Sequence, residues 1–256
     1  MDLELTGKRA LVLGASRGLG KAIAQGLAAE GAIVFAAARS VDKIEAWSVG
    51  MDGVHAVRLD LSNLTAVDKT VDKLLQDGGV DIIVNNGGGP PPGTAQSADR
   101  GDWISHFEAM AANLFHLTNR LLPAMKERKW GRVISITSSG VEQPIPNLAL
   151  SNGIRSAIVG WSKTLANEVA GDGITVNVVM PGRIHTERVD ELDAAASKRT
   201  ETPVEEVAKK SRATIPAGRY GKPQEFADVV TFLASNRASY VTGSRIRIDG
   251  GAIKSI

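Results

Sequence analysis

Cysteine is absent from this chain of 256 residues, which excludes disulfide bonds, thiolate nucleophiles and cysteine-ligated metal sites. Long apolar runs are absent as well. The longest, from Ala32 to Ala38, is far shorter than the roughly 20 residues of a membrane-spanning helix. The first residues, Met1 to Leu5, include two acids and no apolar core, so we expect no signal peptide. We therefore expect a cytoplasmic protein that does not bind membranes.

A strong charge of either sign is also lacking. Lys and Arg together number 30 and Asp and Glu 28, which gives a formal net charge of +2. The basic residues are dispersed, so no nucleic-acid partner is expected. His55, His106 and His116 show no spacing typical of metal ligands, and we expect them at structural or surface positions, with no metal bound.

The pattern of the chain indicates one α/β domain over residues 1–256, because no linker, repeat or low-complexity tract interrupts it. Short apolar runs alternate with segments of helical periodicity, which predicts a parallel sheet with helices on both faces. The expected strands are 10–13, 33–38, 54–59, 81–84, 132–136, 174–179 and 244–248. The main expected helices are 21–30, 64–76 (capped by Ser62 or Asn63), 103–128, 148–170 and 223–235.

The first expected strand runs directly into a glycine-rich turn, with glycines at positions 14, 18 and 20. Glycines let the chain turn tightly and bring backbone N–H groups against a ligand. The helix that follows directs its partly positive N-terminus at the same place, which favours a phosphate or pyrophosphate. The spacing G-x-x-x-G-x-G differs from the common G-x-G-x-x-G fingerprint, so an ordinary strand-to-helix turn is the alternative.

The end of the second expected strand carries a basic residue. A dinucleotide fold that binds NAD carries an acidic residue at this position. Arg39 follows Ala38 there, and Arg17 lies in the glycine turn. Two guanidinium groups and no carboxylate suit a 2′-phosphate, so NADP(H) is favoured over NAD(H). An exposed loop arginine is the alternative for each.

Two stretches between the predicted elements are irregular. Residues 85–93, rich in Gly and Pro, follow the fourth strand and are expected to border a ligand crevice at the carboxyl edge of the sheet. Residues 183–218 are polar and weakly patterned, with one helical piece around 204–212. We expect them to form a substrate lid; an inert surface excursion is the alternative.

A series of motifs runs along almost the whole chain: GASRGLG at 14–20, DL at 60–61, NNGG at 85–88, ITVNVVMPG at 174–182, YVTG at 240–243 and DGG at 249–251. In this order they are similar to the motifs of the short-chain dehydrogenase/reductases, and most of all to bacterial 3-oxoacyl-carrier-protein reductases. The resemblance implies a Rossmann-type doubly wound sheet of about seven strands, a nicotinamide cofactor, a ketone or secondary-alcohol substrate and a homo-oligomer, either a tetramer or a dimer.

The resemblance also implies which residues hold the cofactor. The glycine turn would hold the pyrophosphate and adenosine side, Asp60 and Leu61 the adenine, Asn86 and Gly87 the adenine ribose, and Thr186 the carboxamide. The full expected set is Gly14, Ser16, Arg17, Gly18, Leu19, Gly20, Arg39, Asp60, Leu61, Asn86, Gly87, Gly88, Arg155, Pro181, Gly182, Ile184 and Thr186.

The chemistry of the family rests on an Asn, a Ser, a Tyr and a Lys four residues after the Tyr. Asn113 and Ser138 match the first two. Ser151 and Arg155 stand at the Tyr and Lys positions, and both tyrosines of the chain lie in its C-terminal part. The serine hydroxyl is a much weaker acid than a phenol, whose pKa is about 10. Arginine stays protonated, so it can bind ribose hydroxyls but cannot relay a proton.

Three interpretations follow. The protein is a reductase or dehydrogenase whose protons move through Ser138, Ser151, Asn113 and water, or through His185 on the expected lid, because histidine titrates near neutral pH. Alternatively it binds NADP(H) without turnover and acts as a sensor or scaffold. In the third interpretation the site performs a non-redox step on a carbonyl substrate. For His185, a solvated position on the expected lid is the alternative.

Overall fold

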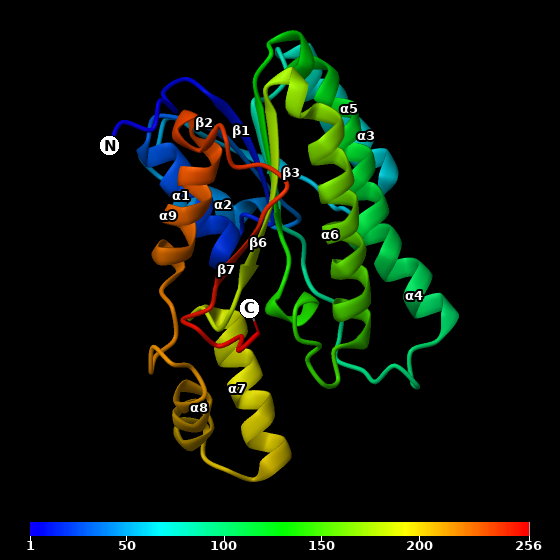
Figure 1. Ribbon diagram of the computed structural model, residues 1–256, viewed down its shortest axis with the longest axis vertical. Helices are drawn as coiled ribbons and strands as arrows, with labels where there is room; N and C mark the ends of the chain where they lie inside the picture. Colours follow the sequence, from blue (N-terminus) through cyan, green and yellow to red (C-terminus); the bar gives the residue numbers. More distant parts are fainter. Residues whose placement is uncertain (256) are drawn as a thin grey trace.

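The computed structural model describes residues 1–255 and is built around a sheet of seven parallel strands (Figure 1). Their order is β3-β2-β1-β4-β5-β6-β7, so the chain moves outward from β1 in both directions. The strands are β1 Arg9–Leu13, β2 Ile33–Ala38, β3 Val54–Arg58, β4 Ile82–Asn85, β5 Gly131–Ile136, β6 Ile174–Pro181 and β7 Arg245–Ile248. The predicted Rossmann-type doubly wound sheet is confirmed.

Helices cover both faces of this sheet (Figure 1). One face carries α1 Gly18–Ala29, α2 Val41–Trp47 and α9 Pro223–Ala234. The other carries α3 Leu64–Gln76, α5 Asn113–Glu127 and α6 Ala149–Val169. Asn63 caps α3 by accepting a hydrogen bond from the amide of Ala66 at 3.0 Å, which decides between the two expected capping residues. Within residues 1–255, no helix is long and apolar enough to cross a membrane.

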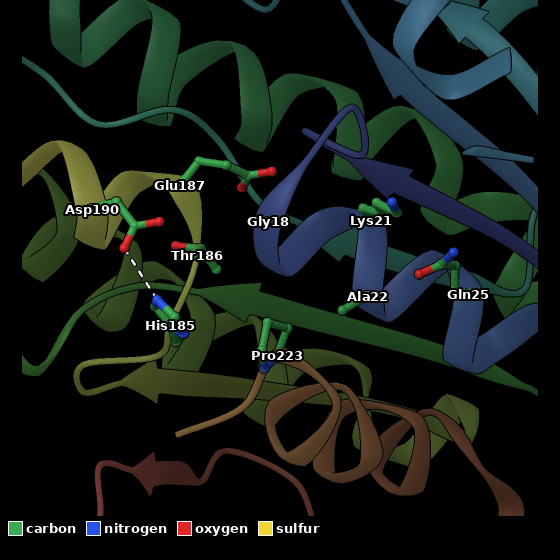
Figure 2. A pocket seen from close by; sticks show the side chains of 9 residues that line it. All are labelled: Gly18, Lys21, Ala22, Gln25, His185, Thr186, Glu187, Asp190 and Pro223. Atoms are coloured by element: carbon green, nitrogen blue, oxygen red, sulfur yellow. Dashed lines mark hydrogen bonds and ion pairs between the residues drawn. The ribbon is translucent and has the colours of Figure 1, made fainter. Parts of the chain in front are cut away.

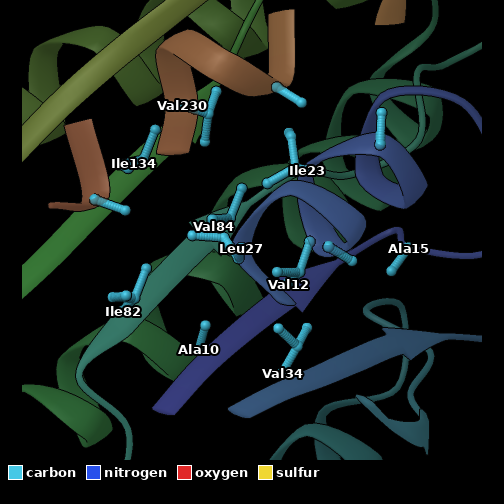
Figure 3. Close-up of a cluster of buried hydrophobic side chains, with 14 of the residues drawn as sticks. Ala10, Val12, Ala15, Ile23, Leu27, Val34, Ile82, Val84, Ile134 and Val230 are labelled. Carbon is cyan, nitrogen blue, oxygen red and sulfur yellow. The ribbon is translucent and has the colours of Figure 1, made fainter. Parts of the chain in front are cut away.

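The central strands consist of nearly unbroken apolar runs because they lie inside the core. Every residue of β4 and β5 is buried, as expected for strands covered on both faces. Figure 3 shows the cluster between the sheet and two helices, in which Val12 and Val84 of the strands face Ile23 and Leu27 of α1 and Val230 of α9. This packing fixes the start of α1, and with it the glycine turn, relative to the strand ends.

The prediction of one long helix over 103–128 is wrong in detail. The chain forms α4 Arg100–Phe107, then a π-helical turn, Glu108–Ala112, and then α5. Periodicity could not show the wider turn, because one extra residue within a helix leaves the apolar spacing on either side intact. π-turns occur often at functional sites, and Asn113 begins the helix that follows this one.

Two helices were missed by the sequence analysis. α2 spans only seven residues, too few for a periodic signal. α7 Glu187–Thr200 precedes α8 Val204–Ala213 in the segment 183–218, below the sheet in Figure 1. α7 buries only Val189 and Asp193, but it carries acids in its first turn and bases in its last, as the helix dipole favours.

Candidate cofactor crevice and active site

A crevice of about 640 Å³ lies at the carboxyl ends of the first four strands. We call it the strand-end crevice. Nine of the expected cofactor residues line it: Gly14, Ser16, Arg17, Arg39, Asp60, Leu61, Asn86, Gly87 and Gly88. α4 and the π-turn contribute His106, Ala109 and Met110, which sequence reasoning did not place there.

The glycine turn is held too closely for side chains. Gly14 has φ +64° and Gly18 has φ +56°, the left-handed region that glycine adopts without strain. A Cβ on Gly20 would collide with the carbonyl oxygen of Gly14, and one on Gly14 would collide with the backbone of Asn86. The side-chain amide of Asn86 donates from Nδ2 to the carbonyl of Leu13 at 3.1 Å. The glycine turn is therefore held in place by direct contact with the loop that follows β4.

Basic side chains line the part of the crevice beside β2. Arg17, Arg39 and Lys43 all reach it, and no carboxylate ends β2. Arg58 donates from Nη1 to the carbonyl of Arg39 at 3.0 Å. Lys43 was missed by the sequence analysis because α2 was missed. Arg39 precedes α2 and Lys43 lies in its first turn, so only the formation of this helix brings Lys43 to the crevice.

Asp60 turns its carboxylate back onto its own loop. It accepts hydrogen bonds from the amide and the hydroxyl of Ser62, at 3.0 and 2.8 Å. These bonds, followed by the charge of Arg39, lower the pKa of Asp60. The carboxylate at this edge of the crevice is therefore ionised and already hydrogen-bonded.

Arg155 of α6 reaches the carboxyl end of β5, directly before Ser138. It donates from Nη1 to the carbonyls of Ile136 and Thr137, at 3.0 and 3.1 Å. Ser151 is buried one turn earlier on the same face of α6. The hydroxyl of Ser138 accepts from the amide of Gly140 at 3.1 Å. Burial lowers the pKa of Arg155 to about 10.

Asn113 is held by a different partner. Its side-chain amide donates to the carbonyl of Leu61, a residue that lines the strand-end crevice, at 2.8 Å. The π-turn before it packs onto α6 through an apolar cluster that includes Met110, Leu150 and Ile154. This cluster links the element that carries Asn113 to the helix that carries Ser151.

The tyrosines lie elsewhere. The hydroxyl of Tyr220 donates to the carboxylate of Asp193 on α7 at 2.7 Å, and the side chain of Tyr240 is fully exposed. His185 lies 3.1 Å from Asp190, also on α7. Neither tyrosine therefore stands on α6 beside Ser138.

The segment after β6 lies against the glycine turn rather than in the strand-end crevice. Cγ2 of Thr186 would lie 3.6 Å from a Cβ on Gly18. Gly182 passes so close to Asp249 that a Cβ would come within 2.6 Å of its Cα. Figure 2 shows a separate pocket of about 400 Å³ at this junction, with Thr186 and His185 on one side and Lys21 of α1 on the other.

Comparison with known proteins covers nearly the whole chain. A family model described as enoyl-(acyl carrier protein) reductase matches residues 14–252. The chain is 38% identical over 250 residues to nodulation protein G of Rhizobium sp. (strain N33), covering 97% of this chain and 98% of that protein. It is 35% identical over 254 residues to the 3-oxoacyl-[acyl-carrier-protein] reductase FabG of Escherichia coli (strain K12), with coverage of 97% and 98%.

Solved structures agree with this relationship. L-sorbose reductase from Gluconobacter frateurii, complexed with NADPH and L-sorbose, matches with a TM-score of 0.94 and 32% identity over 100% of both chains. A variant of actinorhodin polyketide ketoreductase with NADPH matches with a TM-score of 0.91 and 30% identity, covering 97% of this chain and 98% of that one. The sequence similarity and the shared sheet together show that this chain belongs to the short-chain dehydrogenase/reductase family.

Proposed function

We propose that the protein is an NADP(H)-dependent oxidoreductase that interconverts a ketone and a secondary alcohol. The observation that carries the cofactor assignment is the strand-end crevice, in which a close-packed glycine turn meets three cations and no carboxylate ends β2. Relatives solved with NADPH support the same choice of cofactor.

The residues of the crevice, together with the neighbouring segment after β6, fit the parts of this cofactor. Backbone N–H groups of the glycine turn and the N-terminus of α1 would hold the pyrophosphate. Arg17, Arg39 and Lys43 would hold the 2′-phosphate. The adenine would lie beside Asp60 and Leu61, and the segment after β6, with Thr186, would hold the carboxamide.

For the chemical step we assign distinct roles to the groups at the end of β5. A bound nicotinamide supplies or accepts the hydride. Ser138 and Ser151 would donate hydrogen bonds to the substrate oxygen, and the fixed charge of Arg155 would stabilise negative charge on it. Arg155 cannot release a proton at neutral pH, so the proton would come from water held beside Asn113.

A lid and an assembly complete the proposal. We propose that residues 183–218, with α7 and α8, form a substrate lid within one domain spanning 1–256. The substrate would be a small carbonyl compound or alcohol, in keeping with the L-sorbose bound by the Gluconobacter frateurii reductase. We also propose a homo-oligomer, a tetramer or dimer.

One observation favours a second function. Ser151 stands where a proton donor is expected, and the hydroxyl of Tyr220 is bound to Asp193 instead. A protein that binds NADP(H) without turning it over, as a sensor or scaffold, would need no proton donor at this position.

The test is a titration with NADPH and NADH, followed by turnover assays with ketones, diketones and 3-oxoacyl thioesters. The proposed function predicts tighter binding of NADPH than of NADH, and substrate-dependent oxidation. Binding without oxidation across the panel would favour the sensor. Conversion of a carbonyl substrate without nucleotide would favour the non-redox interpretation, and the absence of nucleotide binding would overturn the proposal.

A further inference from the structure

The acidic face of α7 lies on the glycine turn. Glu187 and Glu191 are four residues apart and so project from the same side of the helix. Oε1 of Glu191 lies 2.6 Å from Nη1 of Arg17. Oε2 of Glu187 would lie 4.0 Å from a Cβ on Gly18, and Figure 2 shows its carboxylate extended toward the turn.

The charges of these groups are coupled. The hydrogen bond to Glu191 raises the pKa of Arg17, and the charge of Glu187 adds to this effect. The same hydrogen bond lowers the pKa of Glu191. Glu191 is therefore ionised at neutral pH, and its negative charge lies beside the glycine turn at the start of α1.

α1 itself provides no acid at this place. Its first turn contains no Asp or Glu, and no side chain caps its first amides. A helix N-terminus attracts negative charge, because its amides lack partners and the helix dipole is positive there. In the free protein α7 supplies that negative charge from a segment about 170 residues away in sequence.

We propose that Glu187 and Glu191 occupy, in the free protein, the positions of the cofactor's phosphates, and thereby set its affinity for phosphate-bearing cofactors. This inference rests on the proposed NADP(H) site. Arg17 would exchange Glu191 for the 2′-phosphate, and the start of α1 would exchange Glu187 for the pyrophosphate. The two carboxylates would repel these phosphates, so cofactor binding moves α7 away from the turn.

The decisive variant is E187Q/E191Q, which removes both charges and keeps the size of the side chains. Titration calorimetry should show NADPH binding about 5- to 20-fold tighter than in the unaltered protein. Repulsion between a partly exposed carboxylate and a phosphate weakens binding roughly threefold, and two such pairs are removed. E191Q alone should improve NADPH binding more than NADH binding, since only NADPH carries the 2′-phosphate. Unchanged or weaker NADPH binding by the double variant would overturn the proposal.

The matched control is E205Q/E206Q on α8. It removes two charges from the first turn of the neighbouring helix, where Glu205 pairs with Arg212 at 2.7 Å and not with the glycine turn. Its NADPH affinity should equal that of the unaltered protein. An equal gain in both double variants would assign the effect to net charge and overturn the proposal.

The movement of α7 has its own readout. In hydrogen exchange, amides of 187–200 should exchange faster in the NADPH complex than in the free protein, and should already exchange fast in free E187Q/E191Q. Greater protection of α7 on NADPH binding would contradict the displacement.

A titration with inorganic pyrophosphate separates this inference from the proposed function. If the unaltered protein binds neither NADPH nor NADH, the proposed function fails, but E187Q/E191Q should still bind pyrophosphate more tightly than the unaltered protein. Equal affinity, or no binding by either, would overturn the inference. Equal NADPH affinity of both proteins would overturn the inference while the cofactor assignment stands.

Discussion

The hydroxyl of Tyr220 donates a hydrogen bond of 2.7 Å to the carboxylate of Asp193. That carboxylate is only 6% exposed, and its other oxygen accepts from Arg183 at 2.7 Å. Asp193 therefore joins α7 to the segment that follows β6 and to the segment that precedes α9. This contact attaches α7 to these two flanking segments, although α7 buries few apolar side chains.

Asp193→Asn should destabilise this attachment. Loss of the carboxylate leaves Arg183 without its counter-ion and should reduce the free energy of unfolding by about 1–3 kcal/mol. Tyr220→Phe removes only one hydrogen bond and should cost about 1 kcal/mol. Thermal unfolding and limited proteolysis within 187–213 measure both effects. An asparagine variant as stable and as protease-resistant as the unaltered protein would contradict this role for Asp193.

Tyr and Lys introduced at positions 151 and 155, where the resemblance places the family's pair, should supply a proton donor. In Ser151→Tyr with Arg155→Lys, we expect generic carbonyl reductase activity to rise about 100-fold or more, the usual contribution of a positioned general acid. The assay is NADPH oxidation with small ketones. The matched control is Ser156→Tyr with Arg155→Lys, because Ser156 is exposed on another face of α6. Equal activity of the two double variants would contradict the assigned role of position 151.

The basic residues at the end of β2 should decide between the two cofactors. Arg39→Asp should weaken NADPH binding at least tenfold, about 1.4 kcal/mol, and shift preference toward NADH, because the new carboxylate repels the 2′-phosphate. Lys43→Ala should give a smaller loss of the same sign. Lys209→Ala, an exposed charge on α8, serves as the control and should change neither affinity. Unchanged discrimination in Arg39→Asp would remove Arg39 from the phosphate site.

Two glycine-to-alanine changes should act in opposite directions. At Gly20 the new Cβ would collide with the carbonyl oxygen of Gly14, so the turn must shift. We expect a loss of about 1–3 kcal/mol in stability and loss of NADPH binding. At Gly160, within α6, a Cβ meets nothing within 4 Å, and alanine should stabilise the helix by up to about 1 kcal/mol. Thermal melts and NADPH titrations test both; tight NADPH binding by Gly20→Ala would contradict the close packing of the turn.

The start of α9 should contribute an acid-sensitive part of stability. Arg219, and then the amide of Lys222, lower the pKa of Glu225 to about 2 from 4.5. A lowered carboxyl pKa stabilises the fold above the unfolded value and loses that effect as the pH falls toward 2. Melting temperatures of Glu225→Gln and the unaltered protein should therefore differ near pH 6 and converge toward about pH 2. A difference that stays constant over this range would contradict the assignment.

Local sequence signals predicted most of the fold and part of the crevice. The apolar runs predicted the ends of β1, β2 and β5 to within one residue. Asn63, one of the two residues expected to cap α3, is the residue that caps it. These features depend on neighbours in sequence, through hydrogen-bond geometry and burial on both sheet faces. The glycine turn was visible for the same reason, since its spacing and the following helix are local properties.

Other features arose only from tertiary contacts. The π-turn before Asn113, the short helix that carries Lys43 and the helix α7 have little periodic signal. The hydrogen bonds from Arg155 to the carbonyls of Ile136 and Thr137 join α6 to the end of β5, a contact that no local periodicity indicates.

The pairing of Arg17 with Glu191 is the clearest case. The sequence by itself determined a doubly wound sheet and a glycine turn suited to phosphate, because periodicity and backbone freedom act over a few residues. It could not show that an acidic helix rests on that turn, because 174 residues separate the two charges. Only the packing of the folded chain brings them within hydrogen-bonding distance.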